Sequence, residues 1–261
     1  MINIEPIGIV RSDFKDPHEK KVSKSGAVIE IYPQYSDALL RLGEHSHIWV
    51  LGWFHAAVRN VLRVRPRINL DLPEYGVFGM RSPSRPNPVG LTVTKLEAVE
   101  DNLLYVQRLD FIDGTPIIDI KPYFEQDIIF SPRTPYIKPK EALMLEEIMM
   151  KEALYHHQEE CPPLLLGIKM CLAAERELGQ LTASDVVVSV TGPSCLADTV
   201  QGLTRARLAN PPRFSFHESG SETEVRWQKG SRQVIVRPRS DLDLSAIKEQ
   251  SYAEVLEIVT L

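Results

Sequence analysis

Several features that would narrow the class of this protein are absent from its 261 residues. Only three cysteines are present, too few and too odd in number for a disulfide framework. The longest apolar run, around residues 48–58, is broken by Gly52 and His55, so no segment reaches the roughly 18 residues that a membrane span needs. The first residues lack the basic stretch and apolar core of a signal peptide. We therefore expect a cytoplasmic protein with no membrane partner.

Two further absences concern nucleotides and nucleic acids. No Gly-x-Gly-x-x-Gly follows a strand and no βαβ alternation occurs, which disfavours a doubly wound nucleotide-binding fold. The formal net charge of -5 shows no general excess of basic residues. Residues 1–136 are nearly balanced, however, with 16 Lys and Arg against 17 Asp and Glu. Because a local basic patch matters more for phosphate contact than the total charge, a nucleic-acid partner stays compatible with the sequence.

The first half of the chain has the pattern of a small all-β domain. Short apolar, β-branched runs predict strands at residues 4–10, 27–32, 47–55, 91–96, 103–109 and 117–120. Clusters of proline and glycine separate these runs, which is typical of a barrel or a sandwich. One short helix is expected at residues 36–42, with Ser36 as its N-cap and Gly43 closing it.

The second half has a different pattern and predicts an α+β domain. Residues 131–140 carry three prolines and are interpreted as a linker. Beyond them we expect helices at residues 141–156, 164–178, 196–208 and 244–259, a strand at 186–190, and a β meander at 214–216, 224–227 and 233–236. The predicted domains are residues 1–136 and 141–261.

The segment from Gly76 to Leu91 is the most unusual part of the sequence. Three prolines within six residues stiffen it, and Arg81 and Arg85 stand close together. Paired guanidinium groups on a rigid turn suit a carboxylate or a phosphate. The alternative is a rigid surface loop with solvated arginines, which composition alone favours.

Residues 109–123 form a second candidate segment. Its Asp-Gly-Thr-Pro sequence predicts a turn. The alternation that follows places Asp119 and Lys121 on one face and the isoleucines on the other. The alternative interpretation of these two opposite charges is a surface ion pair without a catalytic role.

The strand predicted at residues 47–55 is the third candidate. If it is regular, His47, Trp49, Trp53 and His55 share one face. A core strand with hydrogen-bonded histidines explains the pattern equally well. No cysteine or carboxylate stands at ligand spacing, so we expect no metal there.

Taken together, these segments resemble the TrmO family of tRNA methyltransferases, also called TsaA-like or YaeB-like. The matching motifs are Pro6-Ile-Gly-Ile-Val-Arg-Ser12, Ser46-His-Ile-Trp-Val-Leu51 with Phe54-His55, Arg81-Ser-x-x-Arg-Pro-Asn-Pro-Val-Gly90, and Leu109-Asp-x-x-Asp-Gly-Thr-Pro-x-x-Asp-Ile-Lys-Pro-Tyr123. They cover about half of the chain and are specific in combination. The resemblance implies a small non-Rossmann β-barrel, S-adenosylmethionine as cofactor and a homodimer. The implied substrate is the threonylcarbamoyl-adenosine beside the tRNA anticodon, methylated on its exocyclic amine.

The resemblance also implies site residues. The cofactor pocket would be lined by His55, Arg81, Leu91, Asp110, Phe111, Ile112 and Asp113. We interpret Arg81 as a partner for the methionine carboxylate, and Asp110 or Asp113 as a partner for a ribose hydroxyl or the amino group. For catalysis we expect Asp119 as the base, with Asn87 orienting the amine and Tyr123 as a further polar group. Expected substrate contacts are Arg85, Lys121, Arg63, Arg65 and Arg67.

One expected element is missing. The family usually carries a Pro-Arg-Gln element after the first strand, where it contacts the cofactor. This chain has Lys15-Asp-Pro-His-Glu-Lys-Lys-Val-Ser-Lys24 instead. Lys20, Lys21 and Lys24 form a basic group there that, with the arginines near residue 63, is a candidate phosphate-binding arm or a solvated face.

Residues 151–240 resemble, more weakly, the FmdE-like domain. The matching stretches are residues 157–167, with His157 and Cys161, and residues 194–201, with Cys195. Glu159 stands where that family has a second histidine. The resemblance implies a metal site, and these residues could bind zinc with Glu159 as fourth ligand. We favour an inherited scaffold without metal, used for dimerisation or RNA docking. Two other functions stay open for the whole chain: a small-molecule methyltransferase and a non-catalytic sensor of S-adenosylmethionine or metal.

Overall fold

The computed structural model describes residues 3–15, 26–240, 242 and 247–261. The chain forms two compact units, Met1–Pro66 with Leu70–Ile128, and Arg67–Asn69 with Ile129–Leu261. The basic group Lys20, Lys21 and Lys24, and nearly all of the stretch that replaces Pro-Arg-Gln, lie outside the described residues.

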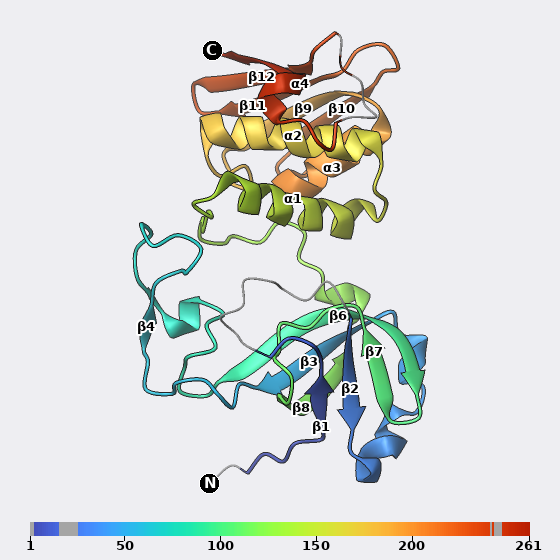
Figure 1. The fold of residues 1–261 in the computed structure, drawn as a ribbon. Helices are drawn as coiled ribbons and strands as arrows, with labels where there is room; N and C mark the ends of the chain where they lie inside the picture. The colour runs from blue at the N-terminus through green and yellow to red at the C-terminus, as the bar shows by residue number, and fades with distance from the viewer. Residues whose placement is uncertain (1–2, 16–25, 241, 243–246) are drawn as a thin grey trace. The chain divides into compact units, whose positions relative to one another are not determined.

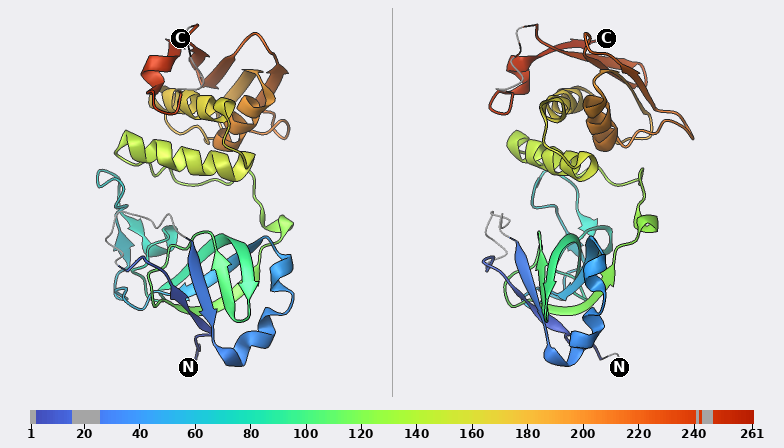
Figure 2. Two further views of the ribbon diagram at one scale, coloured as in Figure 1. Left: turned by 45° about the vertical axis from the view of Figure 1, so that its right-hand side comes forward. Right: turned by 90° about the vertical axis from the view of Figure 1, so that its right-hand side faces the viewer.

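The first unit is a closed six-stranded barrel, which confirms the predicted fold class (Figures 1 and 2). Its strands are β1 (Gly8–Arg11), β2 (Ala27–Ile31), β3 (His47–Trp53), β6 (Val89–Glu100), β7 (Leu103–Val106) and β8 (Pro116–Pro122). They are ordered β1-β2-β7-β6-β3-β8 and all neighbours are antiparallel, with the pairing of β1 and β8 closing the barrel. Closure leaves no unpaired sheet edge in the barrel.

Alternation of side chains builds the barrel core. Along β3, Ile48, Val50 and Gly52 are buried, while the odd-numbered residues between them are only half-buried. The same period places Val10, Ile29, Ile31, Leu104, Val106 and Ile117 inside, each at most 1% exposed. The odd-numbered face of β3 is therefore the outer surface of the barrel, which confirms that His47, Trp49 and Trp53 share a face. His55 lies beyond the end of the strand.

The first unit also contains shorter secondary-structure elements. They are a ribbon of β4 (Arg63–Val64) and β5 (Tyr75–Gly76), and the 3₁₀ helices η1 (Pro33–Leu39), η2 (Leu42–Glu44), η3 (Val77–Gly79) and η4 (Glu125–Asp127). The helix predicted at residues 36–42 is wrong in type and bounds. Pro33 begins η1 earlier because its fixed φ suits a first helical position, and Arg41 interrupts the run with a φ of 65°.

The second unit is a five-stranded sheet with helices packed on one face, which confirms the α+β prediction (Figures 1 and 2). The helices are α1 (Ala142–His157), α2 (Pro162–Leu178), α3 (Ser194–Thr204) and the short α4 (Tyr252–Val255). The strands are β9 (Val186–Gly192), β10 (Phe214–Glu218), β11 (Glu224–Lys229), β12 (Arg232–Pro238) and β13 (Leu256–Thr260), in the order β10-β9-β11-β12-β13.

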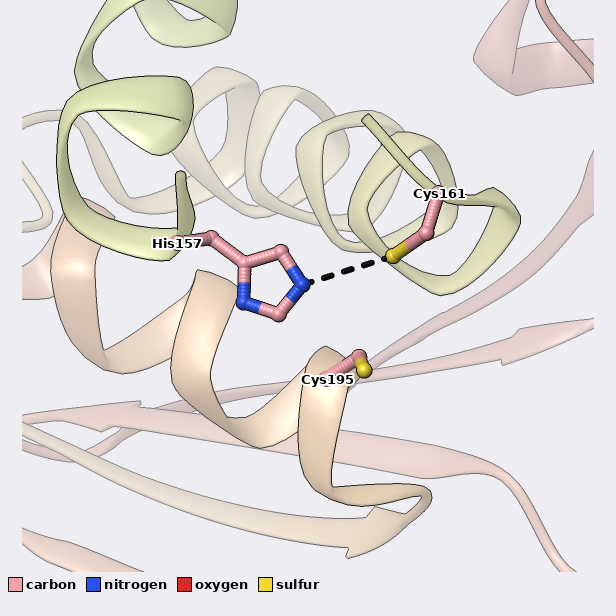
Figure 3. A group of neighbouring side chains, drawn as sticks. All are labelled: His157, Cys161 and Cys195. Atoms are coloured by element: carbon pink, nitrogen blue, oxygen red, sulfur yellow. Dashed lines mark hydrogen bonds between the residues drawn. The ribbon is translucent and has the colours of Figure 1, made fainter. Parts of the chain in front are cut away.

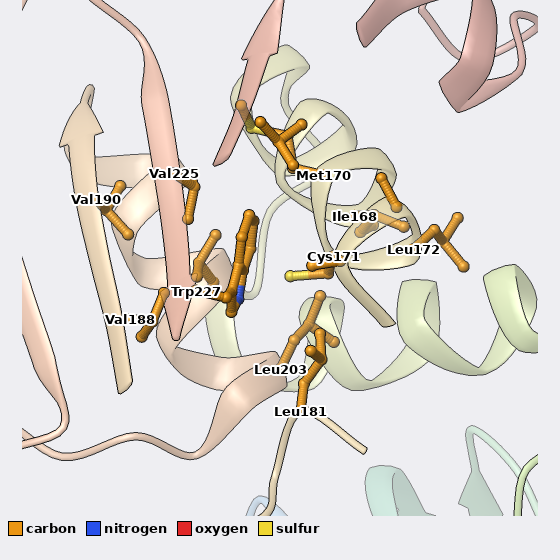
Figure 4. Close-up of a cluster of buried hydrophobic side chains, with 14 of the residues drawn as sticks. Ile168, Met170, Cys171, Leu172, Leu181, Val188, Val190, Leu203, Val225 and Trp227 are labelled. Carbon is orange, nitrogen blue, oxygen red and sulfur yellow. The ribbon is translucent and has the colours of Figure 1, made fainter. Parts of the chain in front are cut away.

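The core of this unit lies between the sheet and α2 (Figure 4). Trp227 of β11 is fully buried among side chains of the sheet and of α2, with Cys171 nearby (Figure 4). Helix α2 is buried along most of its length, and Gly179 ends it with a φ of +76°. No helix in the described part of the chain is long and apolar enough to cross a membrane.

Two expectations for the second unit are wrong. The terminal helix shrinks to α4, and the following residues form β13 instead, paired antiparallel with β12. Leu256, Ile258, Val259 and Thr260 suit an edge strand, and the available edge of β12 overrides their helical spacing. The meander is also broken, because β10 pairs in parallel with β9, while β11 follows on the other side of β9.

The proline-rich segment expected to be a linker is bonded to the second unit. The Tyr136 hydroxyl donates to the Glu175 carboxylate over 2.6 Å, and the Ser131 hydroxyl donates to the carbonyl of Arg205. The amide of Lys140 donates to the carbonyl of Ile68, which joins the short segment at residues 67–69 to the same unit.

Candidate functional sites

Three candidate residues of the first unit, Leu91, Asp119 and Lys121, lie on the outer face of β6, β3 and β8. In the strand register Leu91 pairs with Leu51, and Leu51 pairs with Asp119. Leu51 therefore has Leu91 on one side and Asp119 on the other, so a candidate cofactor residue and the candidate base lie on one face. One step along, Trp49 lies between Val93 and Lys121 in the same way.

A β-bulge orients Asp119. The register shifts between Leu51 and Gly52, so that Gly52 pairs with Ile117 and Ile118 is left over. The extra residue lets Ile117 point into the core while Asp119, two positions later, points outward. Asp119 and Lys121 share this face and form an ion pair of 2.8 Å, which confirms that part of the prediction.

An aromatic group adjoins this ion pair. The ring of Tyr123 lies 5.8 Å from that of Trp49 and 6.4 Å from that of His47. The indole N–H of Trp49 donates to the carboxylate of Asp127 over 3.2 Å. Asp127, in η4, is joined to this group by that bond, and no local sequence pattern indicates it because the contact spans 78 positions.

The arginine-rich segment is fixed to the end of β3. The amide of Phe54 donates to the carbonyl of Pro88 over 2.8 Å, and Arg59 Nε donates to the carbonyl of Pro86 over 3.1 Å. Arg85 Nη2 donates to the carbonyl of Val77 over 2.6 Å. Arg85 therefore holds its own loop together, in addition to any substrate contact. The side chains of Arg81, Asn87 and His55 are exposed.

The segment at residues 109–113 alternates between buried and exposed side chains. Leu109 and Phe111 are buried at 6% and 1% exposure, whereas the Asp110 side chain is 58% exposed, with Arg108 at 3.4 Å. Asp113 accepts a bond from the amide of Ser12 over 3.1 Å. Asp110 is thus the more available of the two carboxylates, and the Phe111 side chain faces the core.

The expected arginine arm does not lie in one unit. Arg63 and Arg65 are exposed on the first unit, and Arg65 Nη1 donates to the carbonyl of Leu70 over 3.2 Å. Arg67 belongs to the second unit, because the segment at residues 67–69 is hydrogen-bonded to Lys138 and Lys140. Sequence proximity alone did not reveal this division.

The second unit contains a separate cluster of metal-binding residue types (Figure 3). His157 ends α1, Cys161 is the N-cap of α2 and Cys195 lies in the first turn of α3. Their ligand atoms all lie within 4.8 Å of one another, and His157 Nε2 is 3.4 Å from Cys161 Sγ. The other imidazole nitrogen, Nδ1, is 2.7 Å from the Asp198 carboxylate.

The donor set fits a metal ion. Tetrahedral zinc with two sulfur ligands and one nitrogen ligand separates these atoms by roughly 3.4–3.8 Å, close to the observed 3.4 Å between nitrogen and sulfur. A carboxylate on the outer imidazole nitrogen is the usual second partner of a metal-bound histidine. Burial raises the pKa of the Cys161 thiol, which the amide of Leu164 partly offsets. Glu159 is exposed and lies outside the cluster, so the expected fourth ligand is not in place.

His156 is the neighbour of this cluster. Its Nε2 lies 3.1 Å from the other Asp198 oxygen, but the angle is not that of a hydrogen bond. The ring lies against Gly202, where any Cβ would stand 2.7 Å from it. The Asp198 carboxylate therefore lies close to both histidines. Glycine at position 202 leaves room for the His156 ring.

Comparison with known proteins agrees with both halves of this description. The family model described as "tRNA-methyltransferase O N-terminal domain" matches residues 9–127, and one described as "FmdE, Molybdenum formylmethanofuran dehydrogenase operon" matches residues 156–252. The chain is 33% identical over 221 residues to a "Probable S-adenosyl-L-methionine-binding protein" of Archaeoglobus fulgidus, a match that covers 80% of this chain and 60% of that protein. It therefore spans less than two thirds of that relative.

Two further relatives match the barrel unit. A "Probable S-adenosyl-L-methionine-binding protein" of Methanothermobacter thermautotrophicus is 48% identical over 128 residues, which cover 48% of this chain and 91% of that protein. The "tRNA (adenine(37)-N6)-methyltransferase" of Mus musculus is 41% identical over 132 residues, which cover 46% of this chain and 30% of that protein. Barrel and motifs together define a methyltransferase-type domain outside the Rossmann class. The chain belongs to the TrmO family.

Proposed function

We propose that the barrel unit transfers a methyl group from S-adenosylmethionine to the exocyclic amine of a tRNA adenosine, the threonylcarbamoyl-adenosine beside the anticodon. The observation that carries this proposal is the outer face of β6, β3 and β8, where Leu91 and Asp119 flank Leu51. The mouse relative, named for methylation of adenine 37, supports the choice of substrate.

We propose that exposed residues of the same unit bind the cofactor. S-adenosylmethionine supplies an electrophilic methyl group on a sulfonium when it is bound. We propose that Arg81 binds its carboxylate, since a guanidinium group pairs well with that shape. Asp110, exposed at the end of the barrel, is suited to a ribose hydroxyl or the amino group. Leu91, 45% exposed, offers an apolar contact, with His55 and Ile112 completing the proposed pocket.

Asp119 is the proposed base. Transfer of the methyl group to the adenosine nitrogen would leave that nitrogen with one proton to lose. The Asp119 carboxylate can accept that proton because the bulge directs it outward and it is 43% exposed. Asn87 is proposed to orient the amine, with Tyr123 near the same face. Lys121 pairs with Asp119 in this structure and is proposed to move to a tRNA phosphate.

Phosphate contact is proposed for Arg63 and Arg65 on the barrel unit and, separately, for Arg67 on the second unit. Arg85 is proposed to contact the substrate in addition to holding its own loop. Two of these guanidinium groups, on Arg63 and Arg65, lie exposed on the barrel unit. A homodimer, implied by the family resemblance, completes the proposal, and sedimentation of the purified chain tests it.

The deciding experiment combines tRNA and cofactor measurements. Nucleosides from tRNA of cells with and without the gene are compared by mass spectrometry, and the purified protein is given labelled S-adenosylmethionine. We expect loss of a methylated threonylcarbamoyl-adenosine, restored by the wild type and by Glu97→Gln, an exposed control on β6, but not by Asp119→Asn. Unchanged tRNA nucleosides together with measurable cofactor binding would overturn the proposal and favour a small-molecule methyltransferase or a sensor.

The cluster in the second unit supports a second candidate function. We propose that His157, Cys161 and Cys195 bind zinc with one coordination position left for another ligand, because the donor spacing fits and Asp198 holds the histidine. Metal analysis of the purified protein tests this, with one zinc per chain expected. Cys195→Ser should lose it, and Cys171→Ala, which removes a buried cysteine outside the cluster, should keep it. A metal-free wild type after refolding with zinc would contradict the proposal.

A further inference from the structure

Phe111 occupies a slot between two strands that only glycine leaves open. Gly52 of β3 and Gly90 of β6 pair directly in the strand register. A Cβ on Gly52 would stand 2.7 Å from the Phe111 ring, and a Cβ on Gly90 would stand 2.7 Å from the same ring and 2.5 Å from that of Phe54. Contacts this short do not occur, so any larger residue would displace a ring. Neither glycine has a positive φ, and the requirement is therefore for space alone.

The slot joins three segments that are far apart in the sequence. The rings of Phe54 and Phe111 meet edge to face at 5.4 Å between centroids. Phe54 also donates its amide to the carbonyl of Pro88, and Gly90 ends the arginine and proline motif. One pair of aromatic rings thus joins three segments, namely the end of β3, residues 85–90 and residues 109–113.

Burial of Phe111 determines which side chains of its segment face outward. Leu109 and Phe111 point inward, so Asp110 and Ile112 between and after them point away from the core. The segment is fixed at its far end as well, because the amide of Asp113 donates to the carbonyl of Phe14 over 2.7 Å. With both ends held, a shift of the ring has to move Asp110.

We propose that Phe111, seated between Gly52 and Gly90 and backed by Phe54, is a positioning residue for methyl-donor binding. It does not touch the donor; it fixes the places of Asp110 and of the segment that ends at Gly90. This inference rests on the proposed function, because it assigns a role in the same cofactor site. On this inference, the motif needs glycine at position 90 because a side chain there would overlap the two rings.

The test measures the dissociation constant of S-adenosylmethionine by calorimetry, for the full chain and well below its melting temperature. Gly90→Ala should weaken binding about tenfold or more, because small misplacements of binding groups carry costs of this order. Gly52→Ala should weaken it as well. Gly43→Ala is the matched control, since its Cβ would meet only ordinary contact at 3.7 Å with Val99, and we expect no change.

Two further variants separate positioning from stability. Phe111→Leu introduced into Gly52→Ala removes the ring atoms that a Cβ at position 52 would overlap, and should restore part of the lost affinity. Ile29→Val, in the barrel core on β2, should lower the melting temperature and leave the dissociation constant unchanged. If Gly90→Ala binds the donor as the wild type does, the positioning role is overturned. If the wild type itself binds no donor, the proposed function fails first.

Discussion

The two units position their candidate functional residues by different structural means. In the barrel unit, the polar residues lie on the outer face of three strands and in the loops at their ends, while the interior is apolar and filled. In the second unit, the polar cluster lies where three helix ends meet. A strand register places residues such as Asp119 by alternation, whereas helix ends gather residues such as Cys161 and Cys195 that no periodic pattern connects.

A comparison of two tryptophans gives the largest expected effect on stability. Trp227→Ala empties the core of the second unit, and we expect about 3–5 kcal/mol of lost stability. Trp49→Ala, on the outer face of the barrel, should cost much less stability but weaken methyl transfer. Calorimetric melting with parallel activity assays measures both. Equal losses of stability for the two variants would contradict the assignment of Trp49 to a surface site.

The proposed base gives the next largest effect. Asp119→Asn removes a proton acceptor but keeps the size and the outward position of the side chain. We expect a 10²–10⁴-fold lower kcat, the usual range for general base catalysis, with a nearly unchanged melting temperature. Single-turnover methyl transfer to tRNA measures the rate. A loss of less than tenfold would assign the proton to water or to another group.

The carboxylate behind His157 gives a smaller effect in the second unit. Asp198→Asn weakens the hydrogen bond to Nδ1 of the His157 imidazole. Hydrogen-bond partners of metal-binding histidines typically contribute 10–100-fold to metal affinity. Competition with a chromophoric chelator measures the zinc affinity. Asp185→Asn, at a loop position of the same unit, is the control and should leave it unchanged. An unaltered affinity in Asp198→Asn would show that the histidine needs no such partner.

The smallest effect concerns pH. Burial raises the pKa of Glu175, although the Tyr136 hydroxyl and Lys138 partly oppose this. A carboxyl group whose folded pKa lies above its unfolded value holds more protons in the folded state, so stability falls as pH rises from the unfolded pKa through the folded one. Glu175→Gln should flatten this decline in unfolding experiments from about pH 4 to neutrality, whereas the exposed Glu147→Gln should not. An identical slope in wild type and Glu175→Gln would contradict the assignment.

The sequence by itself determined the all-β class of the first unit, most strand positions and the motifs that mark the family. The choice of a barrel over a sandwich came from the family resemblance. Alternation is a local property, so the shared face of His47, Trp49 and Trp53 follows from spacing, whereas the structure showed that this face points outward. The spacing of Asp119 and Lys121 likewise gave their shared face and their pairing. The helices of the second unit followed in the same way from apolar periodicity, and Gly179 correctly ended one of them.

Only the tertiary structure decided the features that depend on partners distant in sequence. The bulge at Ile118 arises from pairing with β3, and the inward position of Phe111 depends on space left by Gly52 and Gly90. Strand β13 formed where a helix was expected because the edge of β12 was available to pair with it. Contacts of this kind depend on which distant segments pack together in the folded chain. Composition and local periodicity carry no information about that.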